Sequence, residues 1–165
     1  MTTGVRTIAI AAAVIMAGCG AASGGKAAAT PTQTGASGTF TLADSGCGYQ
    51  GVGQVAAGQV TARLANQTVD RAHFDFWFLQ AGHDYAEFAA YVNDEGRRLR
   101  ASAAPLGHPA FAVLVGSSQV EAGATGQLTA ELAAGSYGMA CIRWKLAGEG
   151  PLDMYPAGPL TVTAP

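Results

Sequence analysis

Charge is scarce in this chain of 165 residues. Charged residues make up 12% of it, and the formal net charge is −2. No cluster of lysine and arginine stands beside an aromatic platform, whereas proteins that bind nucleic acid rely on such clusters to neutralise phosphates. We therefore expect no nucleic acid partner.

The chain also lacks a hydrophobic run long enough for a permanent membrane span. The apolar stretch from Ile8 to Met16 is shorter than the roughly 20 residues that a spanning helix needs. It follows one positive charge, Arg6, and precedes the small pair Ala17-Gly18. This arrangement is typical of a secretion signal that is removed. We expect residues 1–18 to be a signal peptide.

The common catalytic motifs are missing as well. There is no Gly-x-Ser-x-Gly elbow, no His-Glu-x-x-His zinc helix and no phosphate-binding glycine loop. The segment Gly116-Ser117-Ser118 has no base near it in the sequence. We therefore predict that the protein is not an enzyme.

The four residues at the end of this leader and just after it, Met16-Ala17-Gly18-Cys19, resemble the bacterial lipobox. The resemblance implies that Cys19 receives a diacylglyceryl group, becomes the new N-terminus and anchors the protein to the cell membrane on its extracytoplasmic side. The alternative is an ordinary secretion signal with Cys19 as a free thiol. After Cys19, residues 20–38 are mostly Ala, Gly, Ser and Thr, which favours a flexible linker. Residues 39–165 remain for one folded domain.

Only three cysteines are present. If Cys19 carries lipid, Cys47 and Cys141 form an even pair in an oxidising compartment, which favours a disulfide. The alternative is that Cys141 stays free and serves as a metal ligand.

Short alternating segments separated by turn residues predict an all-β fold, a Greek-key β-sandwich of about seven strands. In the segment 73–79, period two places three phenylalanines on one face and His73, Asp75 and Trp77 on the other. The continuously apolar run Ala110 to Val115 predicts a buried strand. The Gly- and Pro-rich segment Gly148 to Pro159 predicts a connection.

One helical insertion, from about Asp84 to Arg100, interrupts the strands. Asp84 is placed to cap its first turn with Glu87 three residues later, and apolar residues recur at helical spacing. Gly96 lies inside the helix, where glycine costs about 1 kcal/mol relative to alanine, so we expect fraying there.

From residue 40 to residue 162 this order of elements resembles the cupredoxin-like domain. The resemblance rests on a His-x-Phe segment at His73, a Gly-x-Tyr-x-x-x-Cys strand ending at Cys141, and Met154 in the segment before the last strand. It implies that His73, Cys141 and Met154 occupy three of the four copper-ligand positions of that family. The second histidine, which should follow the cysteine, is missing.

We therefore expect a cupredoxin-like domain without a cofactor, acting as a metal-free binding or interaction module for an unknown protein or small molecule. The alternative is a copper protein with a non-blue site that uses His73 with Met154 or another histidine.

Overall fold

The computed structural model describes residues 36–145 and 150–164. The predicted signal peptide, Cys19 and nearly all of the predicted linker lie outside these residues. No helix within them is long and apolar enough to cross a membrane. The elements, in chain order, are β1 (Ala36–Ala43), β2 (Gly46–Gly51), β3 (Gln54–Ala56), β4 (Gly58–Asn66), β5 (Arg71–Leu79), α1 (Tyr85–Arg100), β6 (Ala112–Val120), β7 (Thr125–Leu132), β8 (Gly135–Trp144) and β9 (Pro151–Thr163).

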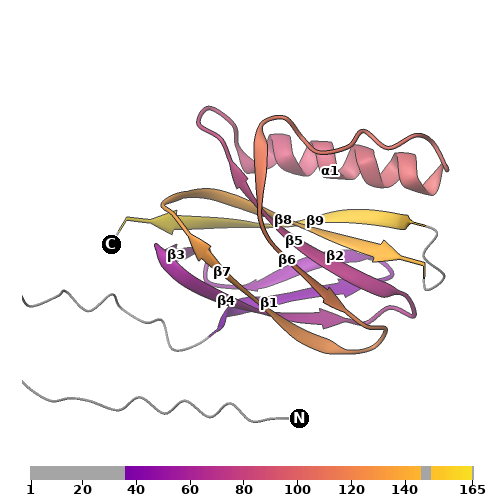
Figure 1. The fold of residues 1–165 in the computed structure, drawn as a ribbon, viewed down its shortest axis with the longest axis horizontal. Coiled ribbons are helices and arrows are strands. Elements are labelled where there is room, and N and C mark those ends of the chain that lie inside the picture. The colour runs from indigo at the N-terminus through magenta and orange to yellow at the C-terminus, as the bar shows by residue number, and fades with distance from the viewer. Residues whose placement is uncertain (1–35, 146–149, 165) are drawn as a thin grey trace, which may run out of the picture.

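The strands form two facing sheets, with the helix lying along the outer side of one of them (Figure 1). Sheet A has the order β2-β1-β4-β7, and sheet B has the order β3-β9-β8-β5-β6. The chain passes repeatedly between the sheets, so the predicted Greek-key β-sandwich with one helical insertion is confirmed. The described residues hold nine strands, not about seven, and the two short strands β2 and β3 lie in a glycine-rich part of the chain.

The main core lies between the two sheets and follows from strand alternation. Phe74 and Phe76 of β5 are fully buried there, beside Met139 and Cys141 of β8. Burying a phenylalanine side chain contributes roughly 1.5 to 3 kcal/mol, so β5 anchors the sandwich. The opposite face of β5 carries His73, as the alternation predicted.

A second core lies between sheet B and α1, where Phe88 and Val92 of the helix pack against Trp77 of β5. The helix begins where predicted, because Asp84 Oδ1 accepts a hydrogen bond from the Glu87 backbone N–H at 2.9 Å. The expected fraying at Gly96 is wrong. Gly96 is buried, and a Cβ atom there would collide with the backbone carbonyl oxygen of Met154, so glycine permits close contact between α1 and β9.

The C-terminal end of α1 is fixed to sheet B by a buried carboxylate. Asp153 of β9 is 1% exposed and pairs with the guanidinium of Arg100. It also accepts a hydrogen bond from the Tyr155 hydroxyl at 2.5 Å and lies 3.9 Å from Arg143. A buried carboxylate needs such partners to offset its desolvation, so these contacts hold the helix in place.

The expectation of a buried strand at Ala110 to Val115 is wrong. Strand β6 begins at Ala112 and forms an edge of sheet B, where Val113, Leu114 and Val115 are 46%, 40% and 36% exposed. The register against β5 shifts between Gly116 and Leu114, which leaves Val115 as a bulge. Bulges of this kind are common on edge strands, where they interrupt further pairing.

The segment expected to be a connection is largely strand, because β9 begins at Pro151. Its prolines are compatible with a strand, since β3 pairs with β9 only from Thr161 to Thr163 and leaves the earlier half of β9 as a sheet edge. An edge does not need the N–H group that proline lacks. Met154 therefore lies on a strand and not in a loop.

Candidate functional site

Cys141 forms a disulfide with Cys47, with their Cα atoms 6.1 Å apart. This confirms the predicted bridge. Cys141 is fully buried in the core between the sheets, and in the register of β8 against β5 it lies opposite Phe74. Because adjacent residues of a strand face opposite sides, His73 points to the other face of sheet B. The residues expected at two of the copper-ligand positions thus lie on opposite sides of one sheet, with the sulfur already bonded.

His73 and Met154 lie on the same face but do not meet. In the sheet register His73 is paired with Ile142, and Ile142 is paired with Met154. Two strand spacings place the backbones of His73 and Met154 about 10 Å apart, with the buried side chain of Ile142 between them. The imidazole of His73 instead packs against Trp144, with ring centroids 5.1 Å apart.

The other two histidines have separate surroundings. His83 Nδ1 lies 2.7 Å from Glu87 Oε2 at the start of α1, and its ring stacks on Phe111. His108 packs edge-on against Trp77, at 5.1 Å between ring centroids. Within residues 36–145 and 150–164, no three His, Cys, Asp or Glu side chains converge as a metal site would require. The residues present therefore do not fit the copper site that the family resemblance suggests.

The face of sheet B that carries His73 contains a cavity beside the helix. Its volume is about 60 Å³, and its walls come from β5, α1, the segment before β6, β8 and β9. The lining residues are Asp75, Trp77, Phe88, Tyr91, Val92, Gly107, His108, Pro109, Ala140, Ile142 and Met154. Most of this surface is apolar, so the few polar groups that line it determine what it can bind.

Asp75 is the carboxylate of this cavity. Its Oδ1 accepts a hydrogen bond from the Ser117 hydroxyl at 2.5 Å, across the β5–β6 pairing. Burial raises the pKa of Asp75, while the Ser117 hydrogen bond and the nearby His73 and His108 oppose that rise. Burial likewise lowers the pKa of His73, and Asp75 opposes this effect. Desolvation is the dominant influence on both groups.

Trp77 also lines this cavity. The residue is 5% exposed, and its indole Nε1 is buried with no hydrogen-bond partner among the described residues. Buried N–H groups normally have a partner, and leaving one unpaired costs about 1–3 kcal/mol. One face of β5 thus carries a buried indole N–H, unpartnered among the described residues, and a partly desolvated carboxylate.

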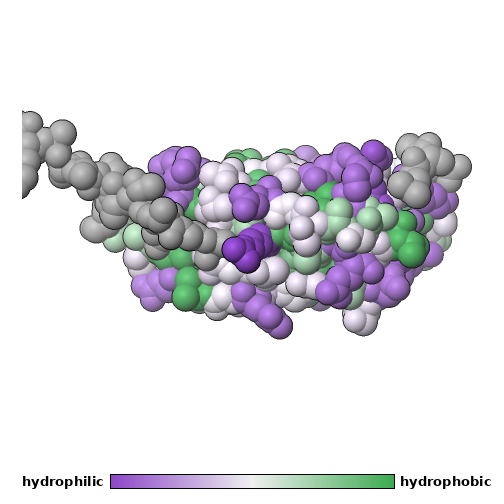
Figure 2. Space-filling view, turned by 90° about the horizontal axis from the view of Figure 1, so that it is seen from below, coloured by the Kyte–Doolittle hydropathy of each residue, from purple (hydrophilic) through white to green (hydrophobic). Residues whose placement is uncertain are grey.

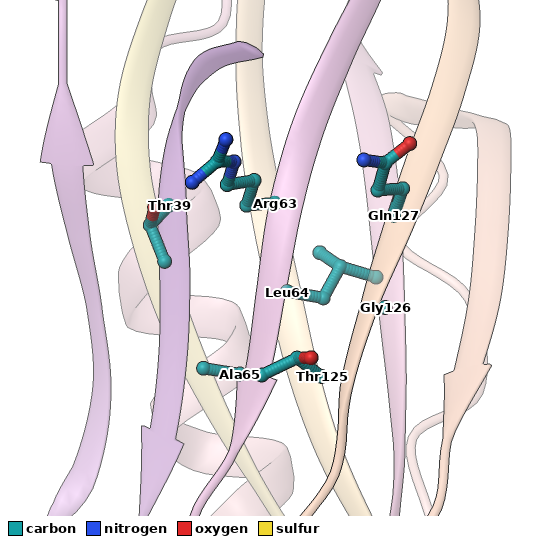
Figure 3. Close-up of a pocket in the computed structure, with 7 residues that line it drawn as sticks. All are labelled: Thr39, Arg63, Leu64, Ala65, Thr125, Gly126 and Gln127. Atoms are coloured by element: carbon teal, nitrogen blue, oxygen red, sulfur yellow. The ribbon is translucent and has the colours of Figure 1, made fainter.

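A second depression lies on the outer face of sheet A, with a volume of about 380 Å³. Figure 3 shows Arg63 of β4 between Thr39 of β1 and Gln127 of β7, in one row across the sheet. Viewed from this side, the surface is mostly hydrophilic or near neutral, with scattered hydrophobic positions (Figure 2). This groove is open and holds no buried unpartnered group, so the cavity on sheet B is the better-defined site.

Comparison with known proteins gives distant matches among solved structures alone. No family model matches the chain, and no curated protein matches it. The dithionite-reduced auracyanin of Roseiflexus castenholzii is 20% identical with a TM-score of 0.39, covering 78% of this chain and 99% of its own. An azurin (Az-iso2) of Methylomonas sp. strain J is 10% identical with a TM-score of 0.37, covering 77% and 95%.

A third match, auracyanin B, is 18% identical with a TM-score of 0.34, covering 76% of this chain and 86% of its own. All three are cupredoxins, the family that the sequence resembles. Similarities this low carry no argument about the site. The fold assignment rests on the strand order and the two-layer packing of this chain.

The sequence identified part of the cavity. The alternation of β5 correctly grouped His73, Asp75 and Trp77, but Ser117 appeared to have no base nearby. The β5–β6 pairing places it directly opposite Asp75. His108 was also missed as a neighbour of Trp77, since it lies in an irregular segment whose path depends on the helix before it. A polar residue at a strand's outward position is the only sequence signal that pointed to Asp75.

Proposed function

We propose that this protein is a metal-free binding module with a cupredoxin-like domain, anchored by lipid on Cys19 to the outer side of the cell membrane. The lipobox-like residues 16–19 and the linker composition support the anchor. The positions of Cys141 on β8 and His73 on β5 argue against a copper site, and this is the observation that carries the proposal. Cys141 faces the core in a disulfide, while His73 faces the opposite side.

The absence of catalysis is part of the same proposal. Ser117 donates directly to Asp75, with no imidazole between them to take up a proton. A serine nucleophile depends on an adjacent general base that is itself held by a third group. The outer face of sheet B is therefore better suited to holding a ligand than to transforming it.

Two experiments test the two halves of the proposal, and the first concerns the anchor. The full chain and its Cys19→Ser variant are expressed in a lipoprotein-processing bacterium, and the membrane fraction and the medium are assayed. We expect the parent chain in the membrane fraction and the variant in the medium, because a thioether-linked diacylglyceryl group cannot form on serine. Retention of the variant in the membrane fraction would contradict the anchor.

The released Cys19→Ser protein is then titrated with Cu(I) and Cu(II). We expect no tight stoichiometric binding, since Cys141 is already bonded and His73 stands apart from Met154 and His83. Stoichiometric binding that His73→Ala abolishes would overturn the metal-free assignment in favour of a non-blue copper site. His83→Ala is the matched control, because that imidazole pairs with Glu87 at the start of α1.

A further inference from the structure

The depression on the outer face of sheet A has the volume of a ligand site. It measures about 380 Å³, and binding sites for small molecules commonly span about 300–1,000 Å³. The cavity beside α1, at about 60 Å³, corresponds to roughly two water molecules at the density of liquid water. The depression on sheet A therefore has room for an organic ligand, whereas the cavity has room for little more than water.

Arg63 is the one charged residue among the described residues that line this depression. Figure 3 shows its guanidinium directed toward Thr39 of β1, with Gln127 of β7 on the other side of β4. The strand register agrees with this view, because Arg63 pairs with Thr39 on one side and with Gln127 on the other. The depression thus places a cation in one row with a hydroxyl group and an amide.

The guanidinium of Arg63 makes no hydrogen bond or ion pair with another described residue. Most other arginines of the fold donate to a carboxylate or a backbone carbonyl: Arg97, Arg98, Arg100 and Arg143. Glu131, the acidic residue of β7, lies opposite Gln59, four residues along β4 and therefore about 13 Å from Arg63. The positive charge is open to a ligand.

The charge and the donors of the depression decide which ligand it suits. One guanidinium without a second cation balances a singly charged anion, and its planar fork can donate two parallel hydrogen bonds to a carboxylate. The hydroxyl groups of Thr39 and Thr125 and the amide of Gln127 both donate and accept hydrogen bonds. These groups match a carboxylate whose body carries hydroxyl groups.

We infer that the depression on sheet A binds a sugar acid, a carboxylate of monosaccharide size. Its carboxylate lies on Arg63 beside Thr39, and its hydroxyl groups reach Gln127 and Thr125. The inference rests on the binding function proposed above and names its ligand class. A ligand of about a dozen non-hydrogen atoms with ordinary binding efficiency should have a Kd of about 1 mM.

Glucuronate is the probe, added to the 15N-labelled full chain in its Cys19→Ser form. Ionic strength is held at about 30 mM, because salt screens an exposed charge. We expect the Nε–H resonance of Arg63 and the backbone amides of Leu64 and Gly126 to shift and saturate, since these residues line the depression. The indole resonance of Trp77, on sheet B, is the internal control and should stay in place.

Two further ligands separate the contributions of the carboxylate and of the hydroxyl groups. Glucose keeps the hydroxyl groups and loses the charge, and acetate keeps the carboxylate and loses the hydroxyl groups. We expect glucose not to bind, and acetate to bind at least about tenfold more weakly than glucuronate, because it forms fewer hydrogen bonds. Acetate that binds as tightly as glucuronate would show that charge alone is recognised and would overturn the sugar-acid class.

Variants test the site itself. Arg63→Gln should weaken glucuronate binding at least about tenfold, the scale of a lost charge-assisted pair. Arg63→Lys keeps the charge but not the planar fork, so it should weaken binding about threefold. Gln127→Glu adds a negative charge to the row and should abolish binding. Arg97→Gln is the matched control, because it makes the same change of charge on α1 and should leave binding unaltered.

The failure of this inference is distinguishable from failure of the proposed function. No shift at about 20 mM glucuronate, well above the expected Kd, or an equal affinity in Arg63→Gln, would overturn the sugar-acid site. The metal-free module would still stand if copper also failed to bind. Copper binding that depends on His73, together with a normal glucuronate response, would overturn the module and leave the site on sheet A intact.

Discussion

Asp75 combines an unfavourable environment with a position in the candidate cavity. Burial raises its pKa above the ordinary value of 3.8, so the folded chain holds this proton more tightly than the unfolded chain. The stability from this group is fully present below pH 3.8 and is lost as the pH rises through the folded-state pKa. Above the folded-state pKa, the ionised carboxylate therefore reduces the stability of the fold relative to acid pH.

We predict that Asp75→Asn raises the melting temperature at pH 7 by at most a few degrees. The difference should shrink as the pH falls toward 3.8, because the parent carboxyl then gains its proton in the fold. Thermal unfolding followed by circular dichroism between pH 4 and pH 7 measures this. A variant that is less stable than the parent at pH 7 would show that the Ser117 hydrogen bond outweighs desolvation, and that Asp75 is a structural residue.

At the scale of elements, local sequence patterns predicted which segments form strands and the helix. They did not predict where a strand lies within its sheet. The alternation of β5 and the capping of α1 by Asp84 depend on neighbouring residues, and both agree with the structure. The apolar run beginning at Ala110 was expected to be buried, but β6 is an edge strand. Nothing in the run itself specifies whether another strand pairs beyond it. For the same reason the sequence predicted only some of the residues around the cavity, since the contact between His108 and Trp77 is tertiary.

The fit of α1 on β9 gives a second prediction, at Gly96. Glycine to alanine in a helix usually stabilises by about 1 kcal/mol. Here the new methyl group would meet the carbonyl oxygen of Met154 and approach Asp153 Oδ1, and overpacking of this kind costs about 1–3 kcal/mol. We expect Gly96→Ala to lower the free energy of unfolding by about 1 kcal/mol net.

Urea unfolding of the variant and of a matched helix control tests this fit. Asn93 is exposed on the same helix, so Asn93→Ala should raise the free energy of unfolding by about 0.5 kcal/mol through helix propensity alone. An increase in stability for both variants would show that α1 does not rest against β9 as closely as described.

At the scale of the whole molecule, the disulfide joins the two layers of the sandwich. Cys47 lies on β2 of sheet A and Cys141 on β8 of sheet B, separated by 94 residues of sequence. In the chain-entropy model, closing a loop of this length removes about 4–5 kcal/mol of freedom from the unfolded chain, though observed effects are often about 2–4 kcal/mol. The bridge is therefore a large part of the stability of a domain this size.

We predict that the double variant Cys47→Ala/Cys141→Ala, made in the Cys19→Ser background, loses about 2–5 kcal/mol of unfolding free energy but still folds. It keeps both hydrophobic cores, on either side of sheet B. Urea unfolding with and without dithiothreitol measures the loss. The reductant should destabilise the parent and leave the double variant unchanged. A parent protein whose free energy of unfolding dithiothreitol leaves unchanged would show that the bridge contributes nothing measurable to the fold.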